Sequence, residues 1–172
     1  MNNKAIFLDR DGVLNRAIIK NYKPFSPMKY DDFYIFKYNY LTLKKLKRNG
    51  FFLIVVTNQP EIARGNLKIT ELNKMHNSLL KNLGIDKIYY CPHDNRDNCI
   101  CRKPNIGLIE KGINEFKIDI RKSFLIGDRK SDIEAGNKLK LKCFYIDRNY
   151  KEEKPNTYYK KIKNLNEILN YI

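Results

Sequence analysis

The chain has 172 residues and a formal net charge of +15, a length that suits one domain with a proper core. The excess of lysine is scattered without a dense basic block, so the composition does not favour a nucleic-acid-binding protein. A positive field would nevertheless attract an anionic substrate. No apolar run approaches the length needed to cross a membrane.

Cysteine usage indicates the compartment. Three of the four cysteines lie between Cys91 and Cys101, and Cys143 stands alone in an apolar run. This clustering favours a metal site in a reducing cytoplasm over a disulfide framework, and we interpret Cys143 as a small buried hydrophobe. The first residues lead straight into an apolar run, which leaves no room for a secretory signal. We therefore expect a cytoplasmic protein that does not bind membranes.

The first half of the chain predicts two strands and two helices around an irregular segment. Residues 4–8 form a short apolar run that is typical of a buried strand. Residues 16–33 carry two prolines and are too punctuated for a helix. An amphipathic helix follows over 40–48, and an apolar strand over 51–56. Residues 70–83 then predict a second helix, with Thr70 as its cap and a glycine at its end.

The second half of the chain continues this alternation. A strand is expected over 85–90, and a helix that starts at Pro104 or Asn105 runs to Phe116. Residues 123–126 predict the fourth strand. A helix over 133–139 then leads into a fifth strand at 142–146. Strands that alternate with helices indicate an α/β protein with a doubly wound parallel sheet.

The C-terminal part adds one further element. The segment 151–157 is polar, and 165–172 predicts a helix that packs back on the body. We see no internal repeat and no second domain boundary. The prediction is one domain over 1–172, with a metal-binding loop at 91–101 and no insertion long enough for a separate cap domain.

Two carboxylates follow the first predicted strand, where Asp9 and Asp11 precede Gly12. Ligands bind at this edge of an open α/β sheet, and a carboxylate there can coordinate Mg²⁺ or form a covalent phosphoryl intermediate. A surface turn is an alternative, because Asp and Gly favour turns. A calcium loop is excluded, because the positions that would need Gly and Glu hold Leu14 and Lys20.

Polar residues also follow the second and fourth predicted strands. Thr57 and Asn58 offer a hydroxyl and an amide that suit phosphate oxygens, although the pair is also a turn signal. Asp128 and Asp132 stand one helical turn apart, with helix capping as the alternative. Since parallel strands end at one edge of the sheet, we expect these residues to converge on Asp9.

The loop after the third strand holds Cys91, His93, Cys99 and Cys101. Three thiolates and an imidazole make the closed tetrahedral set that is typical of structural zinc. Chance clustering is the alternative, and a nucleic-acid zinc knuckle has wider spacing. Such a zinc would fold the loop rather than take part in catalysis. His76, in the second predicted helix, is interpreted as a surface residue.

The pattern Asp9-x-Asp11-Gly-x-x-Asn after an apolar strand resembles the first motif of the haloacid-dehalogenase (HAD) phosphatases. Thr57, Lys103 and Asp128 stand where this superfamily keeps its second, third and fourth motifs. The resemblance implies a HAD-like fold in which Asp9 attacks phosphorus and Asp11 acts as general acid and base. Thr57 and Lys103 would stabilise the transferring phosphoryl group.

The Cys-x-His and Cys-x-Cys-Arg-Lys-Pro patterns, with the run 57–65, resemble the heptose bisphosphate phosphatases, relatives of the histidinol-phosphate phosphatases. The resemblance implies removal of the 7-phosphate of D-glycero-D-manno-heptose 1,7-bisphosphate, in nucleotide-activated heptose synthesis for surface polysaccharide. A histidinol-phosphate or other sugar phosphatase is the alternative. The implied substrate-binding residues are Asn58, Gln59, Arg64, Arg102 and Arg129. The chain departs from the pattern in its short zinc loop, in Ile106 for a usual Pro, and in Arg129 for a usual Lys.

The resemblance also implies cofactors and partners. Mg²⁺ would be held by Asp9, the backbone carbonyl of Asp11, and Asp128, with Asp132 in support. Zn²⁺ would be structural. Asp11 must start protonated, so Asp9 or local hydrogen bonds would have to raise its pKa. The expected partner is a small phosphorylated sugar and the expected state a monomer, with a zinc-dependent nucleic-acid-binding module as the competing class.

Overall fold

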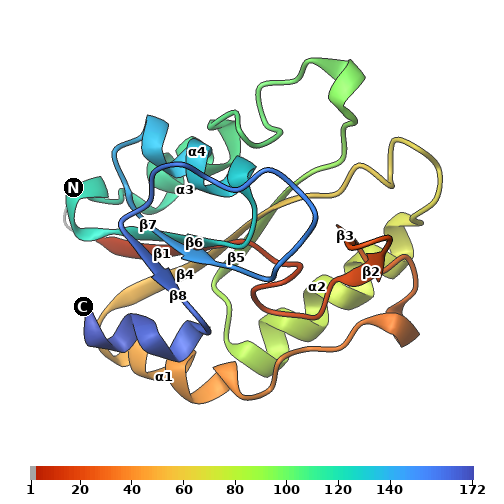
Figure 1. The fold of residues 1–172 in the computed structure, drawn as a ribbon. Coiled ribbons are helices and arrows are strands. Elements are labelled where there is room, and N and C mark those ends of the chain that lie inside the picture. The colour runs from red at the N-terminus through yellow and green to blue at the C-terminus, as the bar shows by residue number, and fades with distance from the viewer. Residues whose placement is uncertain (1–2) are drawn as a thin grey trace.

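The computed structural model describes residues 3–172, and a six-stranded sheet in the order β5-β4-β1-β6-β7-β8 forms its centre (Figure 1). All neighbouring strands in this sheet are parallel, which confirms the predicted fold class. The strands are β1 (Lys4–Leu8), β4 (Phe51–Asn58), β5 (Lys87–Cys91), β6 (Phe124–Gly127), β7 (Lys142–Ile146) and β8 (Lys160–Ile162).

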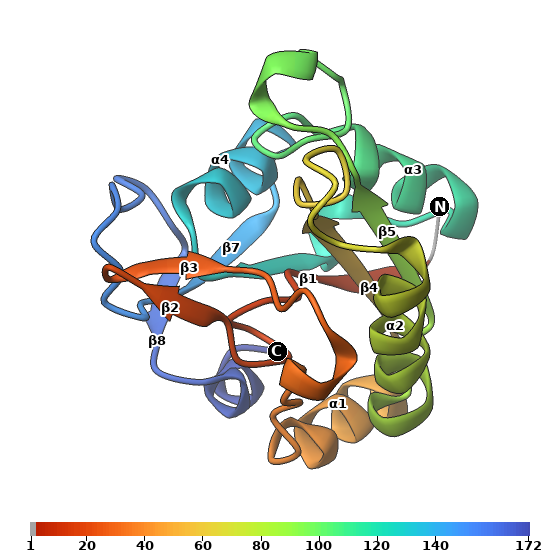
Figure 2. The same ribbon diagram turned by 90° about the vertical axis from the view of Figure 1, so that its right-hand side faces the viewer.

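Helices cover both faces of the sheet, as Figure 2 shows with α3 and α4 above it and α1 and α2 below it. One hydrophobic core joins α1 (Asn39–Arg48), α2 (Ile69–Leu83) and the 3₁₀ helix η4 (Leu165–Asn170) to one face. A second core joins α3 (Gly107–Phe116) and α4 (Lys130–Lys138) to the other face. Because the central strands are buried on both sides, their sequences are almost continuously apolar.

The chain changes direction across the sheet at β1. From β1 it runs through α1 to β4 and through α2 to β5, then returns on the opposite face through α3 to β6 on the other side of β1. The carboxyl ends of β1, β4 and β6 therefore flank a crevice. In open α/β sheets this is where ligands bind.

Two features at the margins were not predicted. β2 (Ile18–Lys20) and β3 (Lys23–Phe25) form an antiparallel hairpin inside the segment expected to be irregular. Its turn residues Asn21 and Tyr22 both have positive φ angles, 50° and 62°, as a tight hairpin turn requires. The edge strand β8 lies in the C-terminal tail, where three residues are too few to show an alternating pattern.

The helix ends differ in detail from the predictions. Gly84 closes α2 in the left-handed conformation as expected, but the N-cap is Lys68, so the prediction of Thr70 as cap is wrong. α3 begins at Gly107, two or three residues later than expected, and the C-terminal helix is the 3₁₀ helix η4. Within residues 3–172, no helix has the length and apolar character to cross a membrane. Further 3₁₀ turns are η1 (Tyr30–Asp32), η2 (Asn95–Asp97) and η3 (Ile120–Lys122).

Candidate active site and metal centre

The ends of β1, β4 and β6 bring Asp9, Thr57 and Asp128 together. Asp9 and Thr57 line a pocket of about 40 Å³, and Asp128 is buried. Gly12 makes the close approach of the first and fourth motifs possible. Its φ is +88°, and a Cβ on it would lie 1.7 Å from Asp128 Oδ2, so a larger residue could not occupy this turn.

Lys103 also lines this pocket. Its buried ammonium donates to Asp9 Oδ1 and to the carbonyl of Val56, and it pairs with Asp132 Oδ1, each at 2.6 Å. These three acceptors match its three N–H donors. Burial would lower the pKa of Lys103, but Asp132 and Asp9 outweigh it and raise the pKa. Burial raises the pKa of Asp9 to about 6 despite this cation.

Asp9, Asp128 and Asp132 offer carboxylate oxygens within 4.8 Å of one another. Asp132 is already engaged, because Oδ1 pairs with Lys103 and Oδ2 accepts from the Arg129 amide at 3.0 Å. Asp128 Oδ1 is buried without a hydrogen-bond partner in the part of the chain that the structure describes. Burial, followed by Asp9 and Asp132, raises the pKa of Asp128 well above its ordinary value. Asp9 and Asp128, with this unpaired oxygen, fit a hard cation such as Mg²⁺.

Asp11 lies among hydrogen-bond donors. Arg10, Asn15, Ser26 and Gln59 all donate to its carboxylate, at 2.8 to 3.1 Å. Burial would raise the pKa of Asp11, but Arg10, with Asn15 and Gln59, holds the pKa below its ordinary value. In this conformation the donated hydrogen bonds stabilise the charged form of Asp11, whereas the expectation of a protonated Asp11 applies to the start of the reaction and stays a prediction.

Arg10 is a fully buried cation beneath the site. It donates to Gln59 Oε1 at 2.9 Å, and its NH1 group lies 3.3 Å from His76 Nε2. Arginine can only donate, so His76 Nε2 accepts and the ring is neutral, with its proton on Nδ1. Burial, followed by Arg10, lowers the pKa of His76 to about 3. The prediction of a surface position is wrong, since His76 is 7% exposed.

Two residues predicted to bind substrate, Asn58 and Gln59, form hydrogen bonds with protein groups in this structure. Asn58 exchanges two 3.0 Å hydrogen bonds with the backbone N–H and carbonyl of Lys103. Gln59 is fully buried and donates to Asp11 at 3.0 Å and to Thr57 at 2.9 Å. Asn58 still lines the pocket, but both of its polar atoms are occupied. These amides position the lysine, the carboxylate and the hydroxyl of the site.

The pocket adjoins a groove of about 410 Å³ that is lined by Arg64, Arg102 and Arg129, the arginines expected to bind substrate. Arg129 donates to both carboxylate oxygens of Glu152, at 2.7 and 2.9 Å. Arg64 likewise has carboxylate partners, which are Glu61 and Asp94. The charges of both arginines are thus balanced within the protein.

Arg102 differs from the other two arginines of the groove. It donates to Asn95 Oδ1 at 2.6 Å and to the carbonyl of His93 at 3.3 Å, and both of these partners are uncharged. Burial lowers the pKa of Arg102, as expected for a cation that loses water without gaining a carboxylate. Arg102 therefore carries the least compensated positive charge among the three.

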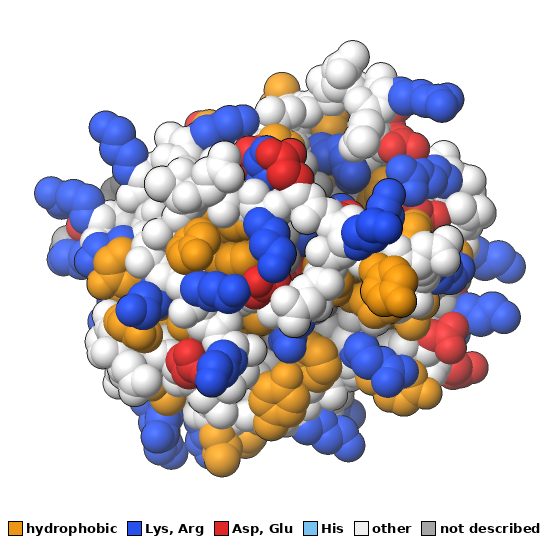
Figure 3. All heavy atoms as spheres, in the orientation of Figure 1, with side chains coloured by type: hydrophobic (Ala, Val, Ile, Leu, Met, Phe, Trp, Pro, Cys, Tyr) orange, Lys and Arg blue, Asp and Glu red, His pale blue; other side chains and the backbone are white. Residues whose placement is uncertain are grey.

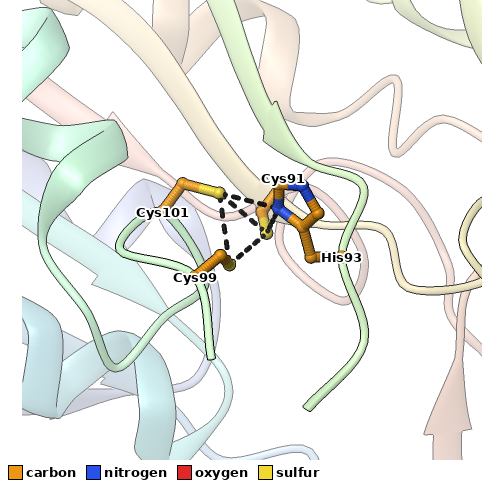
Figure 4. Close-up of side chains that lie close together, drawn as sticks. All are labelled: Cys91, His93, Cys99 and Cys101. Atoms are coloured by element: carbon orange, nitrogen blue, oxygen red, sulfur yellow. Dashed lines mark hydrogen bonds between the residues drawn. The ribbon is translucent and has the colours of Figure 1, made fainter. Parts of the chain in front are cut away.

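The four predicted zinc ligands converge at the end of β5 (Figure 4). The sulfur atoms of Cys91, Cys99 and Cys101 are 3.1 to 3.5 Å apart. His93 Nδ1 lies 3.2 Å from Cys101 Sγ and 3.5 Å from Cys91 Sγ. A tetrahedron of Zn–S bonds of about 2.3 Å has edges of roughly 3.7 Å, so the cluster is close to that geometry. All four cysteines of the chain are free thiols.

Three contributors to the site were missed from the sequence. Arg10 could have been found, because a basic residue stands between two predicted catalytic carboxylates. Ser26 donates to Asp11 at 2.8 Å from the end of the hairpin, and Tyr150 donates to Asp128 Oδ2 at 2.8 Å from the loop after β7. Neither Ser26 nor Tyr150 lies in a motif, so only the tertiary structure places them.

Comparison with known proteins agrees with this geometry. The polynucleotide kinase 3 phosphatase family matches residues 4–161. The D-glycero-alpha-D-manno-heptose-1,7-bisphosphate 7-phosphatase of Campylobacter jejuni is 36% identical over 99% of this chain and 96% of its own length. The corresponding beta-anomer enzyme of Helicobacter pylori is 36% identical over 99% and 97%.

A solved structure supports the fold. The D,D-heptose 1,7-bisphosphate phosphatase of B. bronchiseptica, in complex with magnesium and phosphate, superposes with a TM-score of 0.83 at 22% identity and covers 99% of each chain. The sequence relatives and the four motifs on this fold determine the family. The chain is a phosphatase that belongs to the D-glycero-D-manno-heptose-1,7-bisphosphate 7-phosphatase family of the HAD superfamily.

Proposed function

We propose that the protein removes the 7-phosphate of D-glycero-D-manno-heptose 1,7-bisphosphate. The observation that carries this proposal is the pairing of a small pocket, floored by Asp9 and Lys103, with an adjoining groove lined by arginines. A small pocket suits the phosphoryl group that reacts, and a basic groove suits a second phosphate on the same sugar. The names of the relatives from C. jejuni and H. pylori support the same substrate.

Two sets of residues would bind the substrate. Lys103 and the hydroxyl of Thr57 would contact the 7-phosphate in the pocket. Arg102 is the first candidate for the 1-phosphate, because its present partners are neutral and an anion would compensate its charge. Arg64 and Arg129 would contribute at the rim after weakening their ion pairs with carboxylates.

In the proposed reaction, Asp9 attacks phosphorus and the bond between phosphorus and the 7-oxygen of the sugar breaks. Asp11 gives a proton to the departing oxygen, and the phosphoryl group remains on Asp9 as an aspartyl-phosphate. Asp11 then takes a proton from water, which attacks phosphorus and releases phosphate from Asp9. When bound by Asp9, Asp128 and the Asp11 carbonyl, Mg²⁺ supplies positive charge that offsets the phosphoryl oxygens.

The hydrogen bonds of Asp11 set a requirement for this reaction. Asp11 is held as a carboxylate by Arg10, Asn15, Ser26 and Gln59. To act as an acid it must first leave some of these donors and take up a proton. In the present arrangement Asp11 is a carboxylate, which is the form that takes a proton from water in the second step of the reaction.

The cluster of Cys91, His93, Cys99 and Cys101 would hold a structural zinc. Four protein ligands leave no position for water, so this metal would not activate a nucleophile. It would fix the loop that ends in Arg102 and Lys103. Because zinc thiolates require reduced cysteines, we place the enzyme in the cytoplasm.

A substrate panel tests the proposal. Phosphate release should be measured with the alpha and beta anomers of the heptose bisphosphate, with histidinol phosphate and with a 3′-phosphorylated oligonucleotide. One heptose anomer should have a kcat/KM at least about tenfold above the other classes. Phosphorus NMR should show that the 1-phosphate remains on the sugar. A preference for histidinol phosphate or for the oligonucleotide would contradict the proposed substrate.

A further inference from the structure

The loop at residues 147–154, after β7, closes one side of the active site. Arg148 Nε donates to the carbonyl of Gly12 at 2.8 Å, which ties the loop to the first motif. The amide of Lys151 donates to the carbonyl of Tyr22 at 2.8 Å, which ties it to the tip of the β2–β3 hairpin beside it (Figure 2). Between these anchors, the Tyr150 hydroxyl donates to Asp128 Oδ2 at 2.8 Å. The hydroxyl is therefore held in place from both sides.

The two oxygens of Asp128 have different environments. Oδ2 accepts from Tyr150 and lies against the backbone of Gly12, where an added Cβ would be 1.7 Å away. Oδ1 is buried and has no hydrogen-bond partner among residues 3–172. A buried polar atom without a partner costs free energy, and a cation bound at Oδ1 would remove this cost. The structure therefore leaves one oxygen of Asp128 available to a metal.

We propose that Tyr150 is a positioning residue that sets the metal selectivity of the site. By occupying Oδ2, it makes Asp128 a ligand through Oδ1 alone. Mg²⁺ requires near-octahedral geometry with bonds of about 2.0–2.1 Å, whereas Ca²⁺ takes six to eight oxygens and accepts both oxygens of one carboxylate. A carboxylate restricted to one oxygen favours Mg²⁺ over Ca²⁺. This inference rests on the metal role proposed above for Asp9 and Asp128.

A purely structural role for Tyr150 makes a different prediction. If the hydroxyl only fastened the loop, its loss would lower the stability of the protein. It would also lower the affinities for Mg²⁺ and Ca²⁺ by the same factor. A role in selectivity predicts that the ratio of the two affinities changes, because the freed Oδ2 of Asp128 can become a further ligand of Ca²⁺ and so strengthens Ca²⁺ binding more than Mg²⁺ binding. The ratio therefore distinguishes the two roles, and it can be measured without substrate.

The test is Tyr150→Phe, with Mn²⁺ as the probe. Free Mn²⁺ is followed by EPR while Mg²⁺ or Ca²⁺ displaces it from the protein. In the variant, the ratio of the Ca²⁺ to the Mg²⁺ dissociation constant should fall by about tenfold, the usual size of an outer-shell effect on metal affinity. Tyr145→Phe is the matched control, because that hydroxyl faces Asp147 at 3.4 Å and its loss should leave the ratio unchanged.

The outcomes separate this proposal from the proposed function. An unchanged ratio in folded Tyr150→Phe overturns the selectivity role, and circular dichroism establishes that the variant is folded. A chain that binds none of the three cations overturns the metal role of Asp9 and Asp128 as well. If the ratio of dissociation constants falls as expected in Tyr150→Phe, but the wild-type protein does not hydrolyse heptose bisphosphate, the proposed substrate is wrong and the role of Tyr150 stands.

Discussion

Of the residues that the structure describes, Lys103 supplies the one ammonium that lies among the three buried carboxylates of the catalytic centre. It contacts Asp9 and Asp132 directly, while Asp128, within the described range 3–172, has only the hydroxyl of Tyr150 as a side-chain donor. One positive charge does not balance three negative charges in a buried site. The centre is therefore built for a further cation and for a phosphoryl group that this cation would accompany.

Replacing Asp9 by Asn tests the nucleophile. The amide keeps the shape and can still accept from Lys103, but it cannot form an acyl phosphate, so kcat should fall by on the order of a thousandfold or more. The melting temperature should stay the same or rise, because one of three crowded carboxylates is lost. Phosphate release and a thermal melt measure both effects. Asp31→Asn, at an exposed position, is the control, and near-normal turnover in Asp9→Asn would refute the mechanism.

His76 should make the protein sensitive to acid. The folded state lowers its pKa from 6.5 to about 3, so the native ring stays neutral while the unfolded ring takes up a proton below pH 6.5. The stabilising contribution is complete above pH 6.5 and is lost as the pH falls toward 3. Between pH 7 and pH 5 this loss amounts to about 2 kcal/mol of unfolding free energy.

The comparison that isolates this effect is with His76→Gln, which keeps an acceptor for Arg10. Urea unfolding at pH 7 and pH 5 should show a smaller loss of stability in the variant than in the wild type, by about 2 kcal/mol. Other acidic groups titrate in both proteins and cancel in the difference. Equal losses in the two proteins would show that His76 is not neutral in the folded state.

At the scale of elements, three loops surround the active site and supply side chains to it, and no separate cap domain is evident within residues 3–172. The β2–β3 hairpin supplies Ser26 to Asp11, and the loop after β7 supplies Tyr150 to Asp128. The cysteine loop carries Arg102 and Lys103 and is joined to the loop after β4 by the ion pair of Arg64 with Asp94. Each loop thus fixes at least one charged group of the site.

Cys99→Ser tests whether the zinc loop has this positioning role. Loss of one thiolate should lower the zinc content from about one per chain, loosen the loop and displace Lys103. A displacement of about 1 Å can cost roughly a hundredfold in kcat, whereas the Mg²⁺ dependence should be unchanged. Elemental analysis and kinetics provide the measurements. Cys143→Ala removes a thiol outside the cluster and should keep its zinc, and a reduced wild-type protein that is fully active without zinc would contradict this role.

At the scale of the whole molecule, the net charge of +15 is spread widely. Figure 3 shows Lys and Arg side chains scattered over one face among acidic and hydrophobic ones, rather than gathered in one band. The groove beside the active site is lined by four basic residues, Lys23, Arg64, Arg102 and Arg129, and by two acidic ones, Glu61 and Glu152. A net positive charge that is spread over the surface attracts small anions.

This field should make catalysis depend on ionic strength. Raising monovalent salt from about 50 to 500 mM should lower kcat/KM for the heptose bisphosphate by about threefold or more, because screening shortens the range of attraction. For p-nitrophenyl phosphate, which carries less charge, the decrease should be smaller. Stopped assays over a salt series at constant Mg²⁺ give both slopes. Parallel slopes would show that the field does not distinguish the two substrates.

Much of the fold and of the site was predictable from local patterns. Apolar runs such as 51–56 and amphipathic runs such as 40–48 identify the parallel sheet and its helices. Asp9, Thr57 and Asp128 follow strands, and parallel strands end at a common edge. The zinc ligands are close in sequence, so their convergence needed little more than one loop. In each case the signal and its structural consequence lie within a few residues or follow from one rule of topology.

Only the tertiary structure decided how the remaining polar groups are used. His76 lies on a helix whose pattern allowed a surface position, yet it is buried, with its Nε2 3.3 Å from the Arg10 guanidinium. Asn58 and Gln59 form hydrogen bonds with protein groups of the site, and the donors around Asp11 stabilise its carboxylate form. Tyr150 reaches Asp128 across 22 positions of sequence. Hydrogen bonds between distant segments depend on the relative placement of packed elements, and no local pattern of residues encodes that placement.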